Sequence, residues 1–170
     1  MDLGPLTGSP RMGRGDRVCW RPLMDDRAHD LLSAALRHVR DAEHLAAAGV
    51  ATTSLDQAYH LAGFAPECAR KATLPRSTYD QAIGHGVGES SEIALQVALA
   101  IDPRAQRYDL ERWRNRFPGL ADWNERARYD RTGTRLHPEV TNVIRESREI
   151  VDRIVLSLWM DGAIRQDFSW

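Results

Sequence analysis

The sequence contains very little lysine and very little cysteine, and the scarcity of cysteine argues against two classes of protein. Lys71 is the single lysine, and arginine takes the other strongly basic positions, a bias that we attribute to genome composition. The two cysteines, Cys19 and Cys68, have no metal-ligand spacing, which argues against a zinc site or a disulfide framework. We therefore expect a protein with no metal and no cofactor, in the reducing cytoplasm.

Long apolar segments are also missing. No apolar run reaches the roughly 18–20 residues that a membrane-spanning helix needs, and the N-terminus lacks the apolar core of a secretory signal. We therefore predict no membrane association. The net charge is −1, so nucleic acid would have to bind at a local patch. The 42% of hydrophobic and 28% of charged residues are ordinary for a soluble globular domain.

Glycine and proline gather in residues 1–24, which have little to bury, so we predict a flexible arm there. Residues 25–165 should form one helical domain. A first helix should run from Asp25 or Asp26 to Gly49. Its apolar stripe is Leu32, Ala35, Leu36, Val39, Ala42 and Ala46. Thr53 or Ser54 should cap a second helix, packed antiparallel on the first.

The later elements are also predicted to be helical. Pro66 should kink the second helix or break it near Phe64. Short helices are expected at residues 79–85 and 90–101, and residues 104–136 should combine helical pieces with loops. A last helix of about six turns should begin near His137 and end at Gly162. Its apolar stripe is Val140, Val143, Ile144, Ser147, Val151, Ile154 and Leu158. The pattern thus predicts an all-α bundle with antiparallel long helices.

Two polar groups of residues are candidate binding sites. His60, Glu67 and Lys71 share one face of the second helix and, with His85, could surround an anionic ligand. The alternative is a Glu67–Lys71 ion pair and a helix cap at His85. Residues 104–135 carry nine arginines, five acids and interleaved aromatic residues. Arginine and aromatic rings can bind RNA, and Arg126 and Arg128 are our candidate contacts. Alternatively, the aromatic residues are core and the arginines are solvated.

The stretch from Asp56 to Ala72 resembles the second helix of the HEPN domain (higher eukaryotes and prokaryotes nucleotide-binding). The resemblance, that of a divergent bacterial member, covers roughly residues 26–162. It includes Trp123-x-x-x-x-Arg128-Tyr129 and the Trp-Met-Asp-Gly end of the last helix. It implies a helical bundle that forms a homodimer or pairs with another subunit. It also implies a role near RNA, toxin–antitoxin or phage-defence systems.

Catalytic members of that family carry an Arg-x(4–6)-His motif, in which Arg would hold a phosphate and His would transfer a proton. Arg131 and His137 match this spacing across a glycine-containing loop, and Arg37 and His44 match it on the first helix. Neither pair has the Arg-Asn-x-x-x-His character of active members. We therefore expect a noncatalytic subunit that binds protein, RNA or nucleotide. The alternatives are a metal-independent endoribonuclease or toxin using Arg131 and His137, and a small-ligand-binding helical protein.

Overall fold

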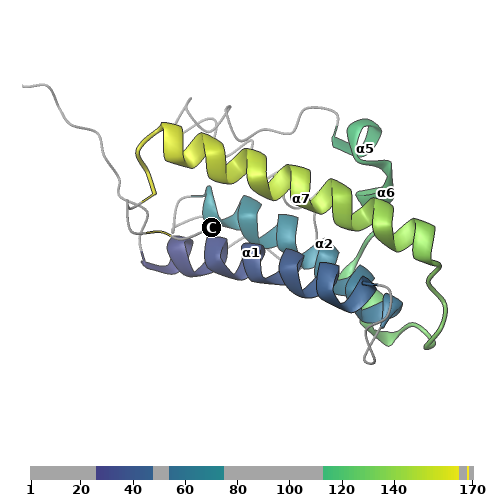
Figure 1. The fold of residues 1–170 in the computed structure, drawn as a ribbon. Coiled ribbons are helices and arrows are strands. Elements are labelled where there is room, and N and C mark those ends of the chain that lie inside the picture. Colours follow the sequence, from purple (N-terminus) through teal and green to yellow (C-terminus); the bar gives the residue numbers. More distant parts are fainter. Residues whose placement is uncertain (1–25, 48–53, 75–112, 165–167, 169–170) are drawn as a thin grey trace, which may run out of the picture.

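A computed structural model describes residues 26–47, 54–74, 113–164 and 168 (Figure 1). Every regular element in these ranges is helical, which confirms the all-α prediction. The elements are α1 (Asp26–Ala46), α2 (Leu55–Ala72), α5 (Trp113–Arg116), α6 (Pro118–Ala121), the 3-10 helix η2 (Glu125–Tyr129) and α7 (His137–Met160). None of the helices described is both long enough and apolar enough to cross a membrane.

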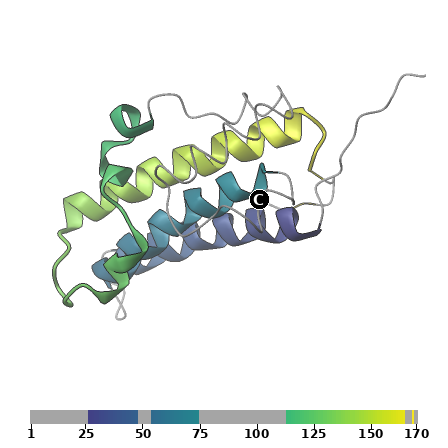
Figure 2. The ribbon, with the colours of Figure 1, turned by 180° about the vertical axis from the view of Figure 1, so that it is seen from behind.

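The three long helices pack side by side around one core. Figures 1 and 2 show α1 antiparallel to α2, whereas α7 runs in the same direction as α2. The backbone N–H of Ser54 donates to the carbonyl of Leu45 at 3.1 Å, so the end of α1 and the start of α2 lie together. All six residues of the predicted α1 stripe are buried, as are all seven of the predicted stripe on α7. The helical periodicity therefore located the core faces of α1 and α7 correctly.

Pro66 lies inside α2 without breaking it, so the predicted break near Phe64 is wrong. Proline has no N–H, and the carbonyl of Ala62, one turn earlier, loses its usual intrahelical partner. The Ser147 hydroxyl on α7 donates to this carbonyl at 2.5 Å. Because Ser147 is fully buried, this bond replaces the missing one in a place that water does not reach. A neighbouring helix thus satisfies the carbonyl that Pro66 leaves free.

The ends of α7 follow the sequence prediction. The helix begins at His137 with Pro138 in its first turn, where the missing N–H costs nothing. Gly162 follows the C-cap with a φ of 65°, in the left-handed region that favours glycine. The N–H of Gly162 donates to the Trp159 carbonyl and that of Ala163 to the Leu158 carbonyl, both at 2.9 Å. These two bonds form a Schellman motif and confirm Gly162 as the end of the helix.

Several predictions concern residues outside the described ranges. The arm at residues 1–24, the helices at 79–85 and 90–101 and the candidate site residue His85 all lie there. The same holds for residues 104–112 of the arginine-rich segment.

Candidate nucleic-acid interface

The chain between α6 and α7 crosses the bundle as a segment held by buried aromatic and aliphatic side chains. Phe117 and Leu120 are fully buried, and Trp123 is 5% exposed. Trp123 lies against Gly63 of α2 so closely that a Cβ there would come within 2.0 Å of its ring. Gly63 therefore makes room for the indole. Phe117 and Trp123 therefore belong to the core, as the alternative interpretation of the arginine-rich segment held, whereas Tyr129 is 76% exposed.

Glu146 of α7 fixes the start of this segment. Its side chain is 1% exposed, and its Oε2 accepts a hydrogen bond from the backbone N–H of Leu120 at 3.1 Å. Asn142 donates to the other carboxylate oxygen at 3.1 Å, and Arg145 lies 3.6 Å from it. A Cβ at Gly119 would come within 2.9 Å of this carboxylate. The buried charge is therefore compensated, and it holds α6 on α7.

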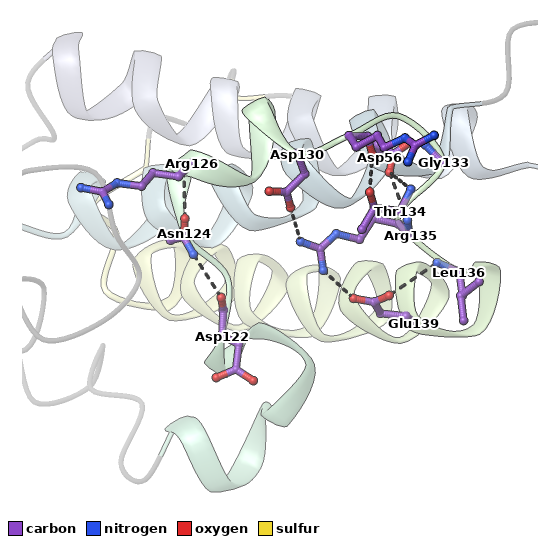
Figure 3. Close-up of polar contacts among 11 residues, drawn as sticks. Asp56, Asp122, Asn124, Arg126, Asp130, Gly133, Thr134, Arg135, Leu136 and Glu139 are labelled. Atoms are coloured by element: carbon purple, nitrogen blue, oxygen red, sulfur yellow. Dashed lines mark hydrogen bonds and ion pairs between the residues drawn. The ribbon is translucent and has the colours of Figure 1, made fainter.

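Asp56 of α2 fixes the other end. Its carboxylate accepts the backbone N–H groups of Gly133 at 2.7 Å and of Thr134 and Arg135 at 3.1 Å each (Figure 3). The turn requires Gly133, whose φ is 84°. These bonds, led by the one from Gly133, lower the pKa of Asp56. The carboxylate thus holds a loop about 77 residues away in the chain.

Arg135 also helps to hold the loop at residues 133–135 against α2. Its guanidinium forms ion pairs with Asp130 at 2.7 Å and Glu139 at 2.8 Å (Figure 3). It also lies over the Tyr59 ring of α2, 3.8 Å from the ring centroid. Because its charge is neutralised and its plane is covered, Arg135 is a structural residue and not a free phosphate contact.

We name residues 121–130 the strap, because they run across α2 between the two anchors at Leu120 and at residues 133–135. The strap includes η2, whose N-terminus is capped by Asn124, with Oδ1 accepting the N–H of Arg126 at 3.0 Å. Arg126, Arg128 and Tyr129 on η2 are all exposed, Tyr129 by 76%. Figure 3 shows the Arg126 side chain directed away from Asp130 and Arg135.

The η2 face is made of Arg126, Arg128, Tyr129 and the following Arg131, which are all exposed. No carboxylate among the described residues pairs with these three arginines, whereas Arg116 pairs with Glu149 at 2.7 Å. The guanidinium of Arg128 lies over the Tyr129 ring at 4.8 Å, which leaves the other ring face open. Such a face can bind phosphates and stack an unpaired base. Arg126 and Arg128 are thus both exposed on the same short helix.

The candidate catalytic residues, Arg131 and His137, flank in sequence the loop at residues 133–135 that Asp56 binds. Both side chains are exposed. The Nδ1 of His137 lies 3.2 Å from the Thr141 hydroxyl, which also donates to the His137 carbonyl at 2.9 Å. The structure records no contact between Arg131 and His137. The other matching pair, Arg37 and His44, lies exposed on α1.

The candidate ligand set on α2 divides into two parts. Lys71 forms an ion pair with Glu67, whose side chain is 2% exposed, as the alternative interpretation proposed. His60 is buried and lies edge-on to Phe64, with ring centroids 4.6 Å apart. It therefore faces an aromatic cluster and not an open anion site.

Metal and thiol chemistry find little support in the described ranges. No three His, Cys, Asp or Glu side chains in those ranges gather as a metal site would require. Burial raises the pKa of the Cys68 thiol to about 11, and the Glu67 charge acts in the same direction. At neutral pH that thiol is protonated and is a poor nucleophile.

Sequence reasoning missed several residues that shape this surface. Asp56, Trp123, Arg135 and Glu146 fix the segment, but each acts on a partner that is distant in the chain. The one available signal was Gly133, whose presence before the last helix indicated a turn. No model of a known family, no curated protein sequence and no solved structure matches the chain.

Proposed function

We propose that this chain is a noncatalytic HEPN-like helical subunit that binds single-stranded RNA or nucleotides through the η2 face. The observation that carries the proposal is the group of exposed cations at Arg126, Arg128 and Arg131 beside Tyr129. Arginine forms bidentate hydrogen bonds with phosphate, and an exposed tyrosine stacks on a base. The two anchors fix both ends of the segment that carries this face, which reduces the ordering needed on binding.

The absence of catalysis rests on geometry. General acid–base chemistry on a phosphodiester needs the phosphate-binding group and the proton-transfer group on the same reacting centre. Arg131 and His137 are exposed at the two ends of the loop that Asp56 binds, and the structure records no contact between them. We infer that the chain binds RNA without cutting it, in a toxin–antitoxin or phage-defence system as the resemblance implies.

A protein-interaction role has its own supporting observation. Leu156, Trp159 and Met160 are 47%, 56% and 72% exposed, and their spacing places them on one side of the last turns of α7. Apolar side chains grouped in this way mark interaction sites more often than scattered ones do. We infer that a second copy of the chain or a partner subunit covers this end of α7, which Figure 1 shows far from η2.

The experiment for RNA binding is fluorescence anisotropy with a labelled single-stranded RNA of mixed sequence in EDTA. We expect binding that weakens as salt rises, and RNA that stays intact on a gel. The double variant Arg126→Glu, Arg128→Glu should weaken binding by at least about tenfold, because two phosphate contacts become repulsive. The double variant Arg40→Glu, Arg153→Glu, at two exposed arginines on α1 and α7 away from η2, is the charge-matched control. Equal affinity in the two variants, or no binding by the wild type, would contradict the proposal.

A further inference from the structure

His60 lies in an apolar environment that leaves part of its ring without a polar partner. The ring is 7% exposed, and Nδ1 is buried with no hydrogen-bond partner. Its neighbours are aromatic: Phe64 lies edge-on at 4.6 Å, and the Trp123 ring is tilted at 6.2 Å. The Trp123 indole N–H is also buried without a partner. A neutral imidazole tolerates such surroundings, but an imidazolium does not.

The strap closes this site and is the part of it that can move most easily. Its backbone hydrogen bonds are local: Trp123 donates to Leu120 and Ala127 to Asn124. No hydrogen bond in the described ranges joins residues 121–129 to α2. Between the anchors the strap is therefore held by nonpolar packing, chiefly that of Trp123 over Gly63. Local opening of such a segment costs less than separating two long helices.

The charges around His60 do not favour its protonated form. The charges of Arg128 on η2 and of His38 on α1 both disfavour a further positive charge on His60. Glu67 on α2 favours it, but its carboxylate is already paired with Lys71. His38 has an unpartnered buried Nδ1 of its own and faces Arg37, Asp41 and Glu67.

We propose that protonation of His60 opens the strap. Trp123 leaves α2 and the imidazolium reaches water, while Leu120 and residues 133–135 stay anchored. The opening displaces Arg126 and Arg128 from the η2 face, which gives the protein an acid-sensitive surface. The proposal does not depend on RNA binding, because the movement is defined in the free protein.

The direction of the effect follows from proton linkage. Burial, and then Arg128 and His38, lower the pKa of His60 below its usual 6.5 while the strap is closed. In the open form the ring is hydrated and its pKa returns toward 6.5. The open form therefore binds the proton more tightly, and opening grows as pH falls below 6.5. The Asp56 pKa is lowered, so this anchor stays ionised over the same range.

The test is hydrogen–deuterium exchange by mass spectrometry on the full chain without RNA, at about pH 7.5 and about pH 5.5. Labelling times are scaled for the intrinsic change in exchange rate. We expect strap peptides to lose protection at the lower pH by up to about tenfold per pH unit, while peptides from the middle of α7 keep theirs. Equal protection of the strap at the two pH values would overturn the proposal.

Variants identify the group that titrates. His60→Phe, or His60→Leu if the larger ring does not fit, should give a strap whose protection no longer depends on pH. His44→Gln, at an exposed histidine on α1, should keep the wild-type response. A response that survives in both His60 variants, or that is lost only in His38→Phe, would overturn the assignment to His60.

Discussion

At the residue scale, the fold depends on polar groups that compensate for one another across helices. Pro66 leaves the Ala62 carbonyl without its usual donor, and Ser147 supplies one from α7. Glu146 is buried, and it accepts the Leu120 N–H and contacts Asn142. Gly63 and Gly119 leave the space that Trp123 and the Glu146 carboxylate occupy. Each of these sites has a partner on another element, so a substitution at one changes the cost of a substitution at the other.

Ser147 and Pro66 give a direct test of this compensation. Ser147→Ala should lower the free energy of unfolding by about 1–3 kcal/mol, because it leaves the buried Ala62 carbonyl unsatisfied. In the Pro66→Ala background the restored N–H bonds that carbonyl, so the same substitution should cost much less. Urea denaturation of the four proteins in the cycle measures the coupling. Additive effects would show that the Ser147 hydroxyl does not replace the missing bond.

At the element scale, the strap and its anchors form a unit that differs from the three long helices. α1, α2 and α7 bury continuous apolar stripes, whereas the strap contributes one large buried side chain, Trp123, between two polar anchors. η2 has no buried residue. The strap therefore presents its charged side chains outward, and its position depends on the Asp56 and Glu146 carboxylates.

Asp56→Ala should loosen the Asp56 anchor selectively. The three N–H groups lose their acceptor but can bind water, so we expect stability to fall by only about 1 kcal/mol. Hydrogen exchange should rise at residues 131–136 and stay unchanged in α1. Because the native pKa of Asp56 is lowered, its contribution is present above the ordinary value of 3.8 and is lost as pH falls below it. Unchanged exchange in the loop would argue against an anchoring role.

At the scale of the whole molecule, the two surfaces proposed for binding lie at opposite ends of the bundle (Figure 2). The η2 face lies beside the start of α2, and the apolar group of Leu156, Trp159 and Met160 lies at the end of α7. A dimer formed through the α7 end would leave both copies of the η2 face accessible. Two linked RNA-binding faces would raise the affinity for a long RNA without any new contact.

The α7 surface predicts concentration-dependent self-association or capture of a partner subunit. Trp159→Ser should weaken a homodimer by at least about tenfold, since exposed aromatic side chains are frequent hot spots. It should leave the melting temperature of the monomer almost unchanged, because the side chain is 56% exposed. Analytical ultracentrifugation measures the association, and Arg153→Ser is the control. A wild type that stays monomeric at high concentration would contradict a homodimer.

The sequence predicted the long helices well because the signals that define them come from residues close together in the chain. Apolar residues at helical spacing identified the buried faces of α1 and α7, and Gly162 marked a helix end. Arg126 and Arg128 were found as candidate contacts because charge density is also local. The surroundings of His60 were not predictable, since they depend on Trp123 from a distant part of the chain. The same holds for Asp56 and Ser147, whose partners only tertiary packing brings near.

The central claim, that RNA binds at the η2 face, is tested most directly by photo-cross-linking. The wild-type chain would be irradiated with a single-stranded RNA containing 4-thiouridine, and the modified peptides would be identified by mass spectrometry. We predict cross-links in the peptide that contains Tyr129, and their loss in Arg126→Glu, Arg128→Glu, because the open face of Tyr129 is available to stack on a base. Cross-links confined to α1 or to the end of α7 would contradict the account.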